Sequence, residues 1–246
     1  LLIVSATLAG LLGFYQAWRD GVQHWTRVEG TMSVYMTFAG LLMMVGMAAL
    51  GRIFFRRPVE PWLYFSVGII SICLLFTLTR QAWFGFLMGL VFLVFIWKKK
   101  FLMFLPVLVA VAFLAFPLQA QERLLSMVSG KDVPFLMRTA LWKGGWEISK
   151  DHLLTGCGFR CVDLLHEQYP DPTGYIKKLR GMHNNFMQLL VDTGILGLSA
   201  WLGIWFYFFR MLYKKAMALE GDKQESWAIF GSVAAVLAFL SGGFFE

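Results

Sequence analysis

Long apolar segments separated by short polar links recur along this 246-residue chain. About 20 apolar residues are needed to cross a membrane, because a helix rises about 1.5 Å per residue and the hydrocarbon is about 30 Å thick. Backbone groups in lipid must pair within their own segment, so apolar runs of this length form helices. Of all the charged side chains, Asp192 alone falls inside these segments. The segments are 1–17, 31–51, 61–79, 81–97, 101–118, 185–209 and 226–245.

This pattern predicts an all-α polytopic membrane protein with about seven transmembrane helices and one large, partly helical periplasmic loop. Residues 1–118 hold helices one to five, 119–184 form the loop, and 185–246 hold helices six and seven. The composition agrees, because 58% of the residues are apolar and 15% are charged, whereas a soluble domain is about 25% charged. The chain begins inside an apolar run and stops as a helix ends, so we expect a fragment of a longer protein.

The distribution of Lys and Arg orients these helices, because cytoplasmic loops carry the excess of positive charge. Ten basic residues lie in the short loops on one side of the predicted membrane, and three, Arg19, Arg27 and Arg80, lie in those on the other. The long loop falls on the less basic side and is therefore expected to face the periplasm or exterior. The net charge of +7 is then mostly a topology signal, and no nucleic-acid partner is needed to explain it.

The long loop contains one predicted amphipathic helix. Asp132-Val133-Pro134 favours a helix start, since Asp caps helices and Pro is tolerated in the first turn. Arg138, Trp142 and Trp146 follow at a spacing of four and so share one helical face. Taken alone, this pattern is also typical of a helix lying on the membrane surface with a snorkelling arginine.

A second informative stretch surrounds His183, which stands just before the sixth apolar segment. If a helix begins near Asn184, then Asn184, Gln188 and Asp192 lie on one stripe. A polar stripe that enters the bilayer must face protein or a wet cavity, so we expect it to border a polar pocket beneath the long loop. A strip of small residues for close helix packing is also predicted, formed by Gly194, Gly197, Ala200 and Gly203.

These stretches resemble one known family. The spacing His-Asn-x9-Gly-x-x-Gly at 183–197 resembles the signature of the O-antigen ligase family, which also contains O-antigen polymerases and O-linked protein oligosaccharyltransferases. Residues 78–83 (LTRQAW) resemble that family's arginine at a short outer turn. Residues 138–142 (RTALW) and 156–158 (GCG) resemble a run in its large periplasmic loop. The similarity covers roughly residues 60–246.

The resemblance implies an inverting, metal-independent glycosyltransferase without a cofactor, in the bacterial inner membrane. It would move a glycan from an undecaprenyl-pyrophosphate donor to an acceptor hydroxyl, O-antigen to lipid A-core, on the periplasmic face. Arg80 and Arg138 would bind the diphosphate, since guanidinium groups bind phosphate oxygens bidentately. His183 would take the proton of the acceptor hydroxyl, because imidazole titrates near neutral pH. Contacts to the pyrophosphate or the acceptor are expected from Arg160, Arg180, Asn184, Asp192 and Trp142.

Several alternatives stay open. An O-antigen polymerase or a protein O-oligosaccharyltransferase would use the same donor site, and a transporter or receptor for an anionic ligand is the alternative outside the enzymes. Taken singly, the two arginines also fit lipid headgroup or surface contacts, and the histidine also fits a helix cap. Cys157 and Cys161 favour a disulfide in an oxidising compartment. They could also stay free, or bind zinc together with His152 and His166. We expect no metal.

Overall fold

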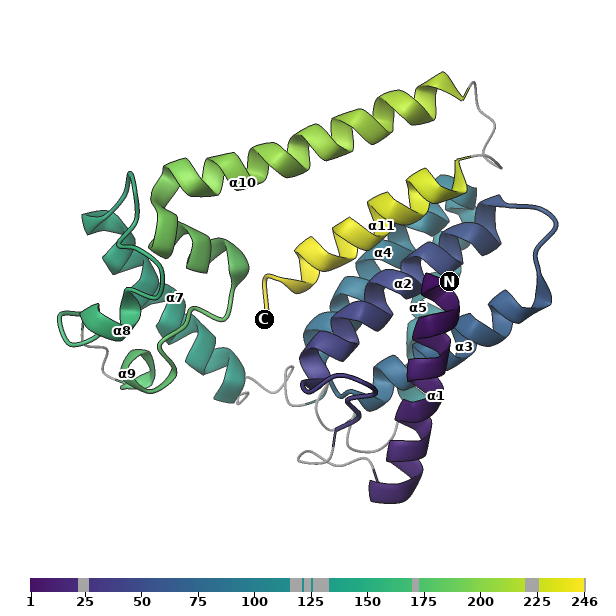
Figure 1. Cartoon of the computed structure of the whole chain (residues 1–246), viewed down its shortest axis with the longest axis horizontal. Helices are drawn as coiled ribbons and strands as arrows, with labels where there is room; N and C mark the ends of the chain where they lie inside the picture. The colour runs from purple at the N-terminus through teal and green to yellow at the C-terminus, as the bar shows by residue number, and fades with distance from the viewer. Residues whose placement is uncertain are drawn as a thin grey trace. The chain divides into compact units, whose positions relative to one another are not determined.

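The computed structural model describes residues 1–21, 27–115, 121, 125, 133–169, 173–219 and 226–245, and the regular structure in these residues is all helical. This confirms the predicted all-α class. In chain order (Figure 1), the helices are α1 (Leu2–Asp20), α2 (Tyr35–Phe55), α3 (Pro61–Phe76), α4 (Arg80–Lys98), η1 (Lys99–Phe104), α5 (Leu105–Ala115), α7 (Val133–Asp151), α8 (Val162–Leu165), α9 (Tyr175–Leu179), α10 (Asn185–Ala218) and α11 (Trp227–Gly242).

The chain forms two compact units, and each is described by itself. Unit 1 combines Leu1–Leu124 with Leu212–Gly242. Unit 2 combines Leu125–Met211 with Gly243–Glu246. The domain limits predicted at residues 118 and 184 follow membrane topology rather than compactness, and they stay predictions.

Membrane-spanning character is strongest in two helices of the described ranges. Helices α2 and α10 are long and apolar enough to cross a membrane, and α3 and α11 are apolar but shorter. A helix lies in each of the seven apolar segments, although residues 116–118 of the fifth are outside the described residues, as is the capping Asp132 of the loop helix. The number of seven spans therefore stays a prediction.

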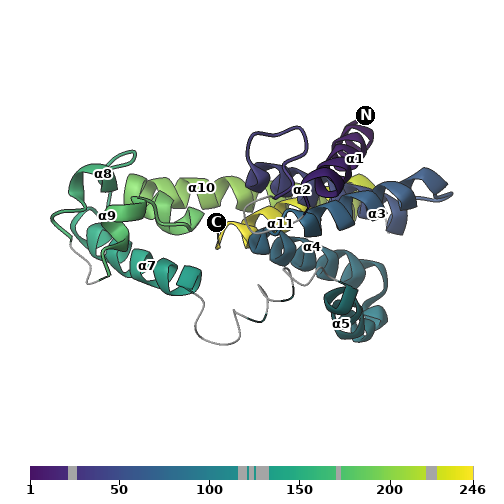
Figure 2. The same cartoon turned by 90° about the horizontal axis from the view of Figure 1, so that it is seen from below.

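Unit 1 is built around α2, which lies beside both α4 and α11 (Figure 2). Glycines allow the close approach of α4 to α2. A Cβ at Gly85 would overlap Met43, and a Cβ at Gly89 would overlap Met47. Two contacts that advance by four residues on both helices show that α2 and α4 run parallel, with Met43 level with Gly85. The same register sets the start of α4 level with the first turns of α2.

Unit 2 is organised around α7, which begins at Val133 as the sequence predicts. Gly144 and Gly145 continue this helix, although glycine in a helix interior costs about 1 kcal/mol relative to alanine. A Cβ at Gly144 would overlap Ile176 of α9, and a Cβ at Gly145 would overlap the Met182 side chain. The glycine pair therefore serves the close approach of other segments to α7.

The long helix α10 is interrupted, which corrects one prediction from the sequence. Gly194 has φ 65° and ψ −168° and breaks the helix. This backbone region is open essentially to glycine alone. The predicted packing strip is therefore wrong at Gly194, and at Gly203 an added Cβ would meet open space.

Candidate active site

The turn that follows α7 closes the break in α10. Among the described residues, backbone hydrogen bonds run in both directions between segments 153–158 and 191–196. The amide and carbonyl groups of α10 that have no helical partner at the break are therefore paired with the turn. The bonds are Cys157 N to Val191 O (3.0 Å), Gly158 N to Asp192 O (3.0 Å), Ile195 N to Leu153 O (2.8 Å) and Leu196 N to Leu154 O (3.3 Å). A Cβ on Gly156 or Gly194 would overlap the backbone of the opposite segment. The Gly-Cys-Gly run and the glycine after His-Asn-x9 therefore meet in space.

A disulfide between Cys157 and Cys161 closes the same turn. The disulfide is thus the alternative that the structure supports. Zinc binds thiolates, and sulfurs bonded to each other are not thiolates, so the zinc set with His152 and His166 is not available in this oxidised form.

His183 is presented to solvent between two buried neighbours. Its backbone is left-handed, with φ 47°, a conformation that is uncommon outside glycine. Met182 is fully buried, and Asn184 is 7% exposed. The Asn184 side-chain oxygen accepts hydrogen bonds from the amides of Phe186 and Met187, at 2.9 and 3.0 Å. The predicted helix start near Asn184 is confirmed, and Asn184 rather than His183 caps it.

Gln188 connects this segment to Asp192. The amide of Met182 donates to the Gln188 side-chain oxygen at 2.9 Å. The Gln188 side-chain nitrogen donates to the Asp192 carboxylate at 3.0 Å, which also accepts a hydrogen bond from the backbone amide of Arg160. The predicted polar stripe therefore exists, and these contacts favour a structural role for Asp192. Helical spacing places Gln188 in the stripe but does not reveal its hydrogen bond to the backbone amide of Met182.

The helix α7 contributes Trp142 to the same place. The indole N–H of Trp142 donates to the carbonyl of Met182 at 3.0 Å, so both backbone groups of Met182 are fixed. Arg138 lies one turn earlier on the same face of α7 and is half-buried. Of the predicted site residues, the structure thus relates Trp142, Arg138 and the segment around His183 within unit 2.

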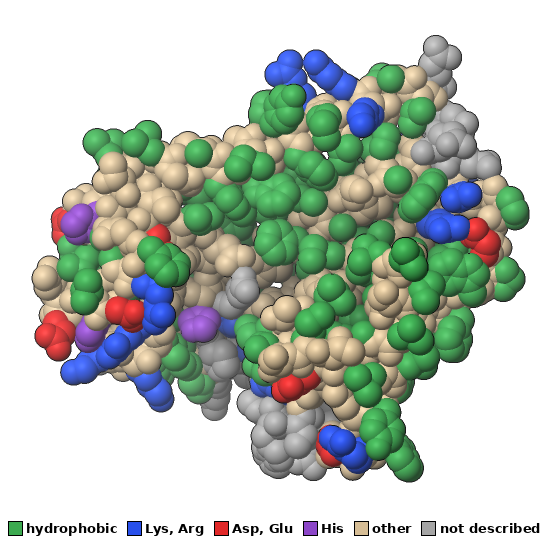
Figure 3. Space-filling view, in the orientation of Figure 1, with side chains coloured by type: hydrophobic (Ala, Val, Ile, Leu, Met, Phe, Trp, Pro, Cys, Tyr) green, Lys and Arg blue, Asp and Glu red, His purple; other side chains and the backbone are tan. Residues whose placement is uncertain are grey.

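The other predicted basic residues of unit 2 gather on its α8–α9 surface. Arg160 forms an ion pair with Asp163 at 2.9 Å, and Arg180 lies 4.0 Å from the same carboxylate. Lys177 and Lys178 are exposed beside them, and Lys and Arg side chains cluster over this region in Figure 3. Arg160 and Arg180 therefore already share an acidic partner, and their contact with a substrate stays a prediction.

Arg80 belongs to unit 1, so its convergence with Arg138 and His183 stays a prediction. It is the first residue of α4 and follows Thr79, which is 5% exposed. Leu78 before it has φ 50°, and the indole N–H of Trp83 donates to Leu74 O at 3.0 Å. The predicted short turn is therefore tightly held. The structure adds Arg27, whose charge interacts with that of Arg80.

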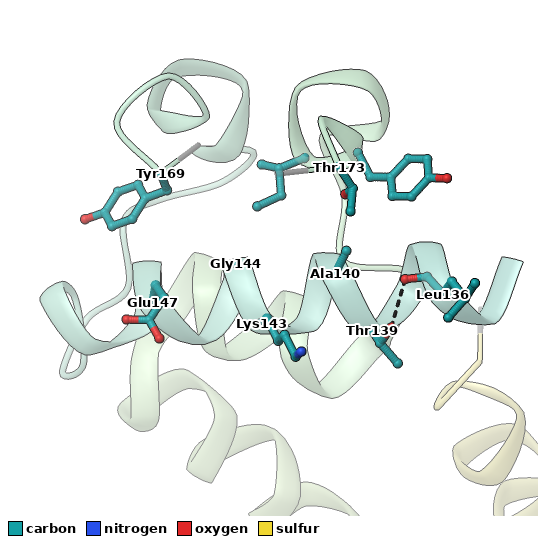
Figure 4. Close-up of a pocket in the computed structure, with 10 residues that line it drawn as sticks. Leu136, Thr139, Ala140, Lys143, Gly144, Glu147, Tyr169 and Thr173 are labelled. Carbon is teal, nitrogen blue, oxygen red and sulfur yellow. Dashed lines mark hydrogen bonds between the residues drawn. The ribbon is translucent and has the colours of Figure 1, made fainter. Parts of the chain in front are cut away.

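A hollow of about 840 Å³ lies along the other face of α7. Figure 4 shows Tyr169 and Thr173 across from the α7 residues Lys143 and Glu147. None of the predicted site residues lines this hollow. The hollow is therefore separate from the face that carries Arg138 and Trp142.

The regular structure of the described residues is all helical, and two of the helices are long and apolar enough to cross a membrane, which fits the broad class of helical membrane proteins. Comparison with known families makes it specific. The family model described as O-antigen ligase matches residues 65–202, which is more than half of the chain. This protein belongs to the O-antigen ligase family, whose members are membrane proteins. Membership implies glycosyltransferase activity of the ligase or polymerase type on glycan and lipid-linked substrates. A search of curated proteins found no match to the chain.

Proposed function

We propose that this chain carries the active site of an inverting, metal-independent glycosyltransferase in the bacterial inner membrane. It moves a glycan from an undecaprenyl-pyrophosphate donor to a hydroxyl of lipid A-core on the periplasmic face. The family match supports the reaction class. The sequence adds that Asp-x-Asp, a common metal-binding pair of glycosyltransferases, does not occur in it.

The observation that carries the proposal is the way in which His183 is held. Met182 is bound through its amide by Gln188 and through its carbonyl by Trp142, and Asn184 caps α10. A catalytic base must keep a fixed position relative to the proton that it takes. The imidazole is exposed while the backbone on both sides of it is fixed, which suits a base that meets a substrate from outside.

Each step of the reaction then has a candidate group. The acceptor oxygen attacks the anomeric carbon of the donor sugar, and His183 takes the proton of that hydroxyl. The bond between the anomeric carbon and the pyrophosphate oxygen breaks, and its electron pair stays on the pyrophosphate. Arg138 and Arg80 stabilise the charge that develops there. One in-line displacement leaves no covalent intermediate, so the anomeric configuration inverts.

The direct test uses the purified full-length protein in nanodiscs with a lipid-linked glycan and three separate acceptors. These are rough lipopolysaccharide, a second repeat-unit lipid and a pilin. We expect transfer to rough lipopolysaccharide with chelator present and no nucleotide added. Loss of transfer in chelator would overturn the metal-independent mechanism. Transfer only to the repeat-unit lipid or only to the pilin would make the protein a polymerase or a protein transferase. Donor binding without transfer to any acceptor would favour the receptor alternative.

Arg138→Lys tests the role of a forked cation. Lysine keeps the charge but loses bidentate binding of phosphate, so transfer should fall by about 10-fold or more. Lys143→Met is the matched control, because Lys143 is another cation of α7 and lines the opposite hollow. Near wild-type transfer by Arg138→Lys would remove Arg138 from the site.

A further inference from the structure

Residues 28–30, between Arg27 and the start of α2, are held in a fixed position in unit 1. Gln16 of α1 accepts hydrogen bonds from the amides of Glu29 and Gly30, at 3.2 and 2.8 Å, and donates to the Gly30 carbonyl at 2.9 Å. Val28 is 2% exposed. Gly30 has φ 61°, and a Cβ there would overlap the ring of Phe38. Three consecutive residues after Arg27 are therefore anchored, and Arg27 itself is half-buried.

The side chain of Arg27 is placed by an aromatic ring. Its guanidinium carbon lies 4.3 Å from the centre of the Tyr35 ring, a distance typical of a cation–π contact. Tyr35 is the first residue of α2. The guanidinium therefore lies at the end of unit 1 where α2 begins.

Arg80 lies at the same end. The parallel register of α2 and α4, set by Met43 with Gly85 and by Met47 with Gly89, brings Phe38 level with Arg80. Arg27, over the ring of the first residue of α2, and Arg80, the first residue of α4, therefore lie at the same end of unit 1. Burial lowers the pKa of Arg27, Tyr35 opposes this shift, and the charge of Arg80 makes a smaller contribution that lowers the pKa further. A diphosphate bound at this end would offset the repulsion between the two guanidinium charges.

We infer that Arg27 and Arg80 together form a two-guanidinium clamp for a diphosphate group. The assignment of its ligand as the diphosphate of the lipid-linked donor rests on the proposed function. Each forked cation can bind one phosphate in the bidentate manner, so a diphosphate is favoured over a single phosphate. Arg27 lies outside residues 65–202, the region matched by the family model. In the sequence it is only one of the basic residues whose distribution orients the helices in the membrane.

Binding measurements on the full-length protein in nanodiscs test this clamp. The probes are undecaprenyl pyrophosphate, undecaprenyl monophosphate and inorganic pyrophosphate, which separate the lipid from the diphosphate contribution. Arg27→Met should raise the Kd for undecaprenyl pyrophosphate about tenfold and the Kd for the monophosphate by clearly less. Arg27→Lys keeps the charge over Tyr35 and should bind the diphosphate several-fold more weakly. Arg19→Met is the control, because Arg19 is exposed and paired with Asp20 at 2.6 Å.

The outcomes separate this inference from the proposed function. If Arg80→Met weakens binding and Arg27→Met does not, the clamp is wrong and the proposed function is untouched. If both variants weaken diphosphate binding but the wild-type protein transfers no glycan, the clamp stands and the transferase proposal falls. If Arg27→Met is too unstable to measure, Arg27→Lys decides, and an unchanged Kd for it overturns the bidentate clamp.

Discussion

Gly194→Ala perturbs the joint between α10 and the turn after α7. Alanine would have to adopt φ 65° and ψ −168°, at a cost of about 1–3 kcal/mol. Its Cβ would also overlap the Leu154 carbonyl and the Gly156 amide. Relief of that overlap separates the two segments and weakens the backbone hydrogen bonds between them, each of which contributes about 0.5–1.5 kcal/mol. We therefore expect a loss of about 3–5 kcal/mol in the free energy of unfolding.

The assay is an unfolding titration in detergent with SDS, together with amide hydrogen exchange in the turn 153–158. Exchange there should rise in Gly194→Ala, because its amides lose their partners in α10. Gly203→Ala is the matched control in the same helix, since an added Cβ there meets open space. It should be neutral or stabilising by up to about 1 kcal/mol. A Gly194→Ala protein that unfolds like the control, with unchanged exchange in the turn, would refute the account of the joint.

Three further predictions follow from the same contacts. Gln188→Met removes both hydrogen bonds of that side-chain amide and should cost about 2–3 kcal/mol in unfolding free energy. Hydrogen exchange of the Met182 amide should become faster, and unchanged exchange there would contradict the prediction. Cys157→Ser removes the disulfide with Cys161, which should lower the free energy of unfolding by about 2 kcal/mol in a thermal melt. In reductant, the variant should have the same stability as the wild-type protein. The pKa of Glu60 is lowered, first by its own backbone amide and then by Arg52. The ionised Glu60 should therefore stabilise the fold fully above a pH near 4.5, the ordinary pKa of this group, and this stabilisation should be lost as the pH falls through the lowered pKa. Glu60→Gln should flatten this pH dependence of the melting temperature, and an unchanged slope would count against the ion pair.

Local signals in the sequence predicted local structure well. The start of α7 at Val133 follows from an Asp-x-Pro pattern, and the helix start after His183 follows from a capping Asn184. Both features depend on residues within one turn of each other, so spacing is enough to find them. The stripe of Asn184, Gln188 and Asp192 is likewise a consequence of helical periodicity.

Contacts between distant segments were not predictable in this way. The sequence places Gly194 in a packing strip, because a small residue in an apolar helix is usually a packing residue. Its actual role depends on backbone partners about 40 residues earlier in the chain. The sequence indicates Arg27 only as a charge, since nothing near it in the chain reveals that it lies over the Tyr35 ring and interacts with the charge of Arg80. In both cases the missing information is tertiary.

The central claim, that His183 is the catalytic base, is tested most directly by transfer kinetics and donor affinity measured on one variant. His183→Ala should lower kcat by about 10²–10⁴-fold and leave the Kd for undecaprenyl pyrophosphate within about twofold of wild type. His152→Ala, another histidine of the same loop, should leave both quantities unchanged. A His183→Ala protein that turns over at the wild-type rate, or that loses only donor affinity, would contradict the claim.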